Sequence, residues 1–173
     1  VSPLLPGDEL NNIEKSTEEF FRLKVSGFNS YVDATPIGLG RNLDGIKVVQ
    51  SRTGLNVIHT TGVHRQAHYN DNFELLNLPS ESLASIFKTE IIEGMRKPNG
   101  ESSGLKAGLV KIGIGEEKIT SFEERALVAA SNVVNETGVG LMIHIEMGSL
   151  AHEVLDLLDE LSCPLNRVAL AHM

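Results

Sequence analysis

Three residues that could carry chemistry lie in short segments that are otherwise apolar: Lys111, His144 and His172. A lysine ammonium inside a buried strand is costly, because burial penalises its charged form. The neutral amine can add carbon dioxide and become a carbamate, an anionic group whose two oxygens can bridge two metal ions. Imidazole is a common ligand of zinc-type ions. A metal site is therefore one interpretation of these residues.

The intervals between these residues favour one architecture. They lie 33 and 28 residues apart, each about the length of one strand, helix, strand unit. Side chains near the ends of neighbouring parallel strands can converge at one mouth. A lone histidine in a strand is more often structural than a metal ligand, and Lys111 could instead form an ion pair with a carboxylate such as Glu146. On the residues alone, both interpretations stay open.

Short apolar runs alternate with helical patterns along the chain. This alternation is typical of an α/β fold, in which crossover helices join parallel strands. The expected strands cover residues 31–35, 56–61, 108–114, 140–146 and 167–172, and the expected helices cover residues 9–25, 42–52, 83–95, 121–136 and 149–161. The polar and aromatic segment 63–78 follows the second strand. Loops in that position lie at the carboxyl end of a parallel sheet or barrel, where ligands bind.

The composition narrows the class of function. The chain has 173 residues, 41% of them hydrophobic, and a formal net charge of -8. This negative field repels nucleic acids and anionic membranes, so a small-molecule substrate or a protein partner is expected. No run approaches the ~18 to 20 apolar residues of a membrane span, and the N-terminus lacks the pattern of a secretory signal. A cytoplasmic protein is expected, and the single cysteine excludes an intrachain disulfide.

Five parts of the sequence resemble, in the same order, strand units of the phosphotriesterase-like family of amidohydrolases. They are VDATPIGLGRN (32–42), TGLNVI with the later TG (53–62), GLKAGLVKI (104–112), ETGV with IHIEMG (136–148) and LNRVALAH (165–172). The resemblance covers nearly the whole chain. It implies a (β/α)8 TIM barrel, here partial, in which residues 1–173 form a single domain with units two to six.

The family resemblance also implies a chemistry. It implies a binuclear centre of two divalent metal ions, with zinc expected, bridged by a CO2-derived carbamate on the catalytic Lys111. His144 and His172 would hold the more exposed ion, and a hydroxide shared by the metals would attack the substrate. The family hydrolyses phosphotriesters, lactones and related esters. Related barrels often form homodimers, so a homodimer is expected by analogy.

In this family the loop after the third strand borders the substrate pocket. His64, Arg65, His68 and Tyr69 fall in that loop, which makes them candidate substrate contacts, although His64 departs from the aromatic residue often found there. The His-x-x-x-His spacing is that of a zinc-binding helix, but the glutamate after the first histidine and an apolar helical face are missing. An exposed polar loop is the alternative.

Two parts of the family's metal site have no counterpart in this sequence. The His-x-His pair of the first strand does not occur, and the aspartate of the eighth strand would lie beyond Met173. A partial barrel leaves two open sheet edges. We therefore expect either a fragment of a longer enzyme or a truncated, catalytically inactive barrel remnant. Such a remnant would bind a ligand or a partner protein through residues 63–78.

Other polar positions are interpreted as structural. His59 is expected to be packed and hydrogen-bonded within a strand. Gly38 and Gly40 are expected to serve a turn, and a phosphate cradle that ends at Arg41 is the alternative.

Overall fold

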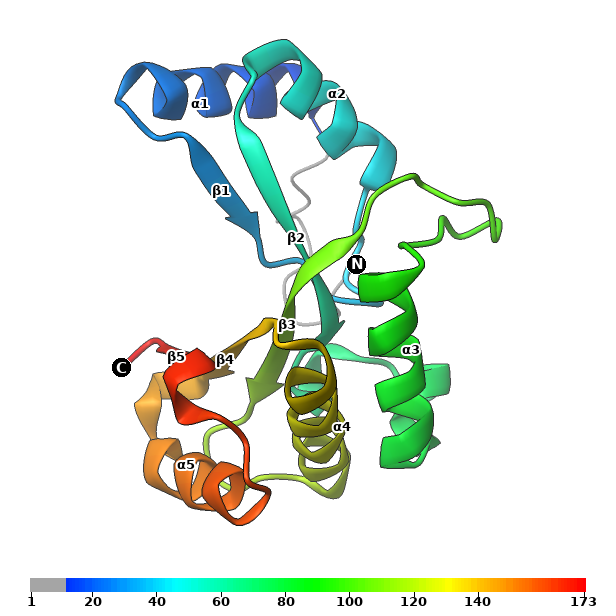
Figure 1. Ribbon diagram of the computed structural model, residues 1–173, viewed down its shortest axis with the longest axis vertical. Coiled ribbons are helices and arrows are strands. Elements are labelled where there is room, and N and C mark those ends of the chain that lie inside the picture. Colours follow the sequence, from blue (N-terminus) through cyan, green and yellow to red (C-terminus); the bar gives the residue numbers. More distant parts are fainter. Residues whose placement is uncertain (1–11) are drawn as a thin grey trace.

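The computed structural model describes residues 12–173 and contains one sheet of five parallel strands in the order β1-β2-β3-β4-β5 (Figure 1). The strands are β1 (Ser30–Asp33), β2 (Asn56–Val63), β3 (Ala107–Ile114), β4 (Gly140–Ile145) and β5 (Val168–Ala171). The helices are α1 (Ile13–Val25), α2 (Leu43–Thr53), α3 (Ser80–Ile92), α4 (Ser121–Thr137) and α5 (Ala151–Glu160). The expected α/β class is therefore confirmed. Within the described residues, no helix is both long and apolar enough to cross a membrane.

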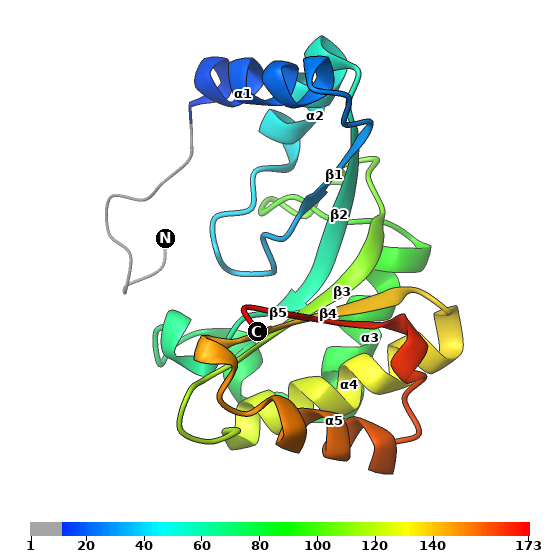
Figure 2. The same ribbon diagram turned by 90° about the vertical axis from the view of Figure 1, so that its left-hand side faces the viewer.

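α3, α4 and α5 lie on one face of a curled sheet, whereas α1 and α2 lie together near the start of β2 (Figure 2). The sheet face turned away from α3, α4 and α5 is called the inner wall. Successive side chains of a strand point to opposite faces. In β3, Val110, Ile112 and Ile114 belong to the core that the sheet shares with α3 and α4, and all three are fully buried. Lys111 lies between them in the sequence and therefore points to the inner wall.

Local sequence explains where the helices begin and end. α4 begins with a capping box, in which Thr120 and Glu123 each accept a hydrogen bond from the other's backbone amide. It ends at Gly138, which has the left-handed conformation that glycine adopts readily. Asn42 caps α2 through its side chain, and Gly54 ends that helix in the same left-handed conformation.

Some element ends differ from the sequence prediction by a few residues. α3 begins at Ser80 rather than at residue 83, and it ends before Gly94, whose φ of 127° is incompatible with a helix. β1 ends at Asp33, because its carboxylate accepts hydrogen bonds from the amide and the hydroxyl of Thr35 and turns the chain. Residues 9–11, expected in the first helix, lie outside the described residues.

A buried ion pair ties the loop after β1 to α3. Arg41 donates two hydrogen bonds to Glu90, of 2.6 and 3.0 Å, and one to the carbonyl of Thr60, of 3.3 Å. The guanidinium of Arg41 is thus hydrogen-bonded within the protein, which favours the turn over a phosphate cradle as the interpretation of this segment. His59 is also buried, but neither ring nitrogen has a hydrogen-bond partner among residues 12–173, so the hydrogen bond expected from the sequence is not found.

Candidate active site

The three candidate metal ligands lie on three neighbouring strands, with His144 and His172 at the carboxyl ends of β4 and β5 and Lys111 three residues before the end of β3. Lys111 lies in β3, His144 is level with Gly113 of β3 and Ala171 of β5, and His172 follows β5 directly. In a regular strand His172 would face the helices, because side chains alternate. Its φ of 67° breaks this alternation, and its ring centroid lies 4.5 Å from that of His144.

Lys111 is a buried lysine whose hydrogen bonding is weak. The residue is 6% exposed, and its Nζ donates one long hydrogen bond, of 3.5 Å, to the carbonyl of Ala34. Burial lowers its pKa to about 8, which brings deprotonation close to neutral pH. The ion pair with Glu146 does not form, since that carboxylate pairs with Arg65 and His144 instead. A neutral amine is the form that can react with carbon dioxide.

Four histidine rings form a row, in the order His68, His64, His144 and His172, and we call the end of the sheet where they lie the mouth. The ring centroids are 4.1 Å apart for His64 and His68, 4.6 Å for His64 and His144, and 4.5 Å for His144 and His172. Burial lowers the pKa of His64 to about 2 and that of His68 to about 4. Burial also lowers the pKa of His144, and the charge of Lys111 acts in the same direction on these three rings. An uncharged imidazole keeps a lone pair for a hydrogen bond or a metal ion.

Tyr69 fixes the start of the loop after β2. Its hydroxyl accepts a hydrogen bond from the amide of His64 and donates one to the carbonyl of Ile37, each of 2.8 Å. Its ring stacks on Phe73 with centroids 4.1 Å apart, and burial raises its pKa. The hydroxyl is therefore occupied by backbone groups. Tyr69 holds His64 against the loop after β1.

Glu123 fixes the next part of the same loop. One carboxylate oxygen accepts from the amide of Thr120 in the capping box, and the other accepts from the amide of Gln66 at 3.0 Å. The residue is 2% exposed. The beginning of α4 and the loop after β2 therefore share one buried carboxylate.

Two glycines allow this loop to lie against β3. A Cβ atom at Gly62 would collide with the carbonyl oxygen of Lys111. A Cβ atom at Gly113 would lie 2.5 Å from the amide nitrogen of Arg65 and 2.7 Å from Nδ1 of His64. Both contacts are far too close for real atoms, so the close approach of the end of β2 to β3 depends on glycine at position 62, and that of the loop depends on glycine at position 113.

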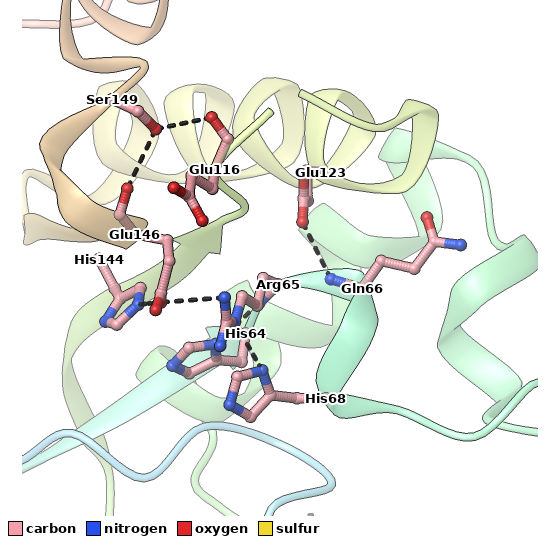
Figure 3. A network of polar contacts seen from close by, with 9 residues as sticks. All are labelled: His64, Arg65, Gln66, His68, Glu116, Glu123, His144, Glu146 and Ser149. Carbon is pink, nitrogen blue, oxygen red and sulfur yellow. Dashed lines mark hydrogen bonds and ion pairs between the residues drawn. The ribbon is translucent and has the colours of Figure 1, made fainter. Parts of the chain in front are cut away.

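A carboxylate joins the loop after β2 to the end of β4 (Figure 3). Oε2 of Glu146 lies 3.0 Å from Nη1 of Arg65 and 2.8 Å from Nε2 of His144. Nε of Arg65 donates to Nδ1 of His68 at 3.0 Å. The hydrogen bond from His144 holds the pKa of Glu146 below its ordinary value, and the Arg65 charge adds to this effect.

The predicted substrate residues lie at the same mouth as the predicted ligands. His64 and His68 pack in the row of rings, and the guanidinium of Arg65 is held beside them. No group of three His, Cys, Asp or Glu side chains within residues 12–173 is arranged to hold a metal ion.

Sequence reasoning missed two residues that organise the mouth. Glu146 was weighed only as a partner of Lys111, yet it binds His144, which precedes it by two residues at the end of the same strand. That spacing was a usable signal, because residues two apart in a strand share a face. Glu123 belongs to a local capping box, but its bond to Gln66 joins positions 57 residues apart and leaves no local pattern.

A sequence profile of the phosphotriesterase family matches residues 5–173. The chain belongs to this family. A phosphotriesterase homology protein of Escherichia coli is 30% identical over 156 residues, which make up 90% of this chain and 51% of that protein. A phospho-furanose lactonase of Mycoplasmopsis synoviae is 28% identical over 172 residues, which make up 94% of this chain and 48% of that protein.

Solved structures of the phosphotriesterase family share the fold. The Escherichia coli phosphotriesterase homology protein, in complex with phosphate, superposes with a TM-score of 0.83 at 29% identity, covering 94% of this chain and 54% of that one. A lactonase from Listeria monocytogenes superposes with a TM-score of 0.85 at 26% identity, covering 95% and 53%. Both are TIM barrels, so the five-stranded curled sheet is part of such a barrel, as predicted. The chain spans about half the length of these relatives.

Proposed function

We propose that the protein is a metal-dependent hydrolase of a small ester, lactone or phosphotriester. The observation that carries this proposal is a buried lysine, Lys111, on the strand beside the one that carries His144, close enough for its charge to lower the pKa of that ring, with the His172 ring 4.5 Å from His144. In barrels of this type the reactive groups lie at the carboxyl ends of the strands. The relatives described as a lactonase and a phosphotriesterase homology protein support the class of reaction.

The donor set fits one side of a binuclear metal centre. Lys111 would bridge two divalent ions as a carbamate, and His144 and His172 would hold the more exposed ion, with zinc as the expected metal. The fit rests on a buried amine with a pKa of about 8 and on two adjacent rings, of which His144 has its pKa lowered by burial. When bound, the ions would supply Lewis-acid activation of water and of the substrate oxygen.

The loop after β2 would bind and orient the substrate. His64 and His68 offer uncharged rings, and Arg65 offers a cation whose side chain is 22% exposed and already held in position. Tyr69 would act behind them as a positioning residue, because its hydroxyl is bonded to backbone groups. A substrate with a polar or anionic group beside the reacting bond suits this lining.

Metal content and activity of the full-length protein test the proposal. Purified with bicarbonate and zinc or cobalt, the protein is expected to bind two divalent ions per molecule and to hydrolyse lactones or phosphotriesters. Lys111→Ala is expected to lose the bridging donor and most of the activity. Lys15→Ala, which changes an exposed lysine of α1, is the matched control and is expected to keep both.

Two results would overturn the proposal. One is a folded full-length protein that binds no metal under these conditions, and the other is a Lys111→Ala variant with unchanged metal content and activity. A folded protein with at most one weakly held ion would favour the alternative, an inactive barrel remnant that binds a ligand or a partner through the loop after β2.

A further inference from the structure

We propose that Glu146 is a positioning residue that sets which ring nitrogen His144 presents to the metal site and that locks the loop after β2 to the end of β4. Figure 3 shows the three side chains that meet at this point, which come from Arg65 in the loop and from His144 and Glu146 at the end of the strand. The part of this inference that concerns metal binding rests on the proposed function, whereas the part that concerns the orientation of His144 does not.

The geometry gives Glu146 two partners on one oxygen. Oε2 lies 2.8 Å from Nε2 of His144 and 3.0 Å from Nη1 of Arg65. All three side chains are mostly buried, with exposed fractions of 16% for His144, 22% for Arg65 and 27% for Glu146. A carboxylate can only accept hydrogen bonds, so Nε2 of His144 carries the hydrogen. Nδ1 is then the nitrogen with the free lone pair.

The backbone after β4 is built to hold this carboxylate. Residues Glu146–Gly148 form a short 3-10 turn in which Met147 has a φ of 55°. Oγ of Ser149 lies 2.7 Å from the carbonyl oxygen of Glu116 and 3.0 Å from that of Glu146, so its one hydrogen is donated to this pair of carbonyls. A non-glycine residue in the left-handed region is uncommon, and here it returns the chain directly after Glu146. The turn therefore fixes the point from which the carboxylate reaches His144.

The same contact orders the substrate loop. Arg65 is held at both ends of its guanidinium, because Nη1 binds Glu146 and Nε donates to Nδ1 of His68 at 3.0 Å. A histidine that binds a metal through one nitrogen commonly donates its other N–H to a carboxylate, which fixes the tautomer and the ring direction. Glu146 would do this for His144 while it also anchors the cation of the loop. The Glu146 carboxylate thereby joins Arg65 in the loop after β2 to His144 of the proposed metal site.

The test compares Glu146→Ala with Glu160→Ala, an exposed glutamate at the end of α5, in the full-length protein. In the metal-free wild-type protein, 15N NMR of the histidine rings is expected to show His144 with its hydrogen on Nε2. Glu146→Ala is expected to populate both tautomers and to lower zinc affinity by about 10- to 100-fold, as for other partners of this kind. Glu160→Ala is expected to match the wild type in both measurements.

The outcomes separate this inference from the proposed function. A hydrogen on Nδ1 of His144 in the wild type, or an unchanged tautomer and zinc affinity in Glu146→Ala, would overturn the role of Glu146 while leaving the metal site standing. A wild type that binds no zinc would overturn the proposed function, yet the tautomer measurement would still decide the positioning role. If Glu146→Ala does not fold, Glu146→Gln is the second variant, because it keeps the size of the side chain. Glu146→Gln is expected to weaken zinc binding while His144 retains its tautomer. An unchanged zinc affinity in Glu146→Gln would overturn the role of Glu146.

Discussion

Replacement of Glu90 by alanine should destabilise the protein strongly, because it leaves a buried cation without its counter-ion. The side chains of Arg41 and Glu90 are each 11% exposed and share two hydrogen bonds, of 2.6 and 3.0 Å. After the change, the carbonyl of Thr60, at 3.3 Å, is the one acceptor within residues 12–173 that the guanidinium keeps. Removal of one partner from a buried ion pair costs about 3–5 kcal/mol.

The matched control is Glu136→Ala. Glu136 pairs with Lys88 and also joins two helices, but the two side chains are 55% and 47% exposed. An exposed pair of this kind contributes about 0–1 kcal/mol. Both glutamates lie within helices, so the gain in helix propensity from alanine is similar and cancels in the comparison.

Urea unfolding of the metal-free full-length protein, followed by circular dichroism, measures both variants. We expect Glu90→Ala to lose at least about 2 kcal/mol more than Glu136→Ala. Arg41→Met combined with Glu90→Leu should recover most of the loss, since no buried charge then lacks a partner. An equal loss of unfolding free energy in the two single variants would refute the reasoning, because burial would then not decide how much an ion pair contributes to stability.

Two further predictions concern the mouth of the site. Gly113→Ala should push His64 and Arg65 out of place and lower both activity and stability, because the added Cβ would meet the backbone of Arg65. Gly115→Ala, whose Cβ would meet its nearest atom at an ordinary 3.7 Å, should behave as the wild type, and equal activity in the two variants would contradict the crowding at Gly113. In the metal-free protein, burial lowers the pKa of Lys111 from 10.5 to about 8. Between about pH 8 and pH 10.5 the unfolded chain therefore binds more protons than the folded protein, so the free energy of unfolding should rise with pH across that range. The urea midpoint of the wild type should increase with pH across this range, and the increase should be smaller in Lys111→Met, which lacks the amine. An identical pH profile in the variant would show that the pKa of the amine is not perturbed.

Most of the fold could be predicted because its signals are local. The expected helix 121–136 agrees with α4 to within a residue at each end, where a capping box at Thr120 and the glycine at position 138 mark its limits. The interval from Lys111 to His144 placed them on neighbouring strands, and the register puts them two residues apart in level. The errors fall at ends that depend on special backbone conformations. An example is His172, whose φ of 67° ends β5 one residue earlier than expected.

The site was harder to predict, because its organising contacts join distant parts of the chain. Residue types and spacing indicated Lys111 and His144, but nothing near Gln66 in the sequence points to its partner 57 residues away. The same holds for Tyr69, whose aromatic ring suggested a substrate contact while its hydroxyl bridges two loops. Such contacts exist only once the strands have paired, so they carry no local pattern.

The shared carboxylate of Glu123 makes the loop after β2 and the first turn of α4 a single cooperative unit. When the loop leaves the sheet, the amide of Gln66 loses its acceptor, and the buried carboxylate keeps only its capping bond to Thr120. When the first turn frays, the carboxylate moves away and the loop loses its anchor. Release of the loop from the sheet is thereby linked to the stability of the first turn of α4, and a change to the cap should alter how often the loop opens.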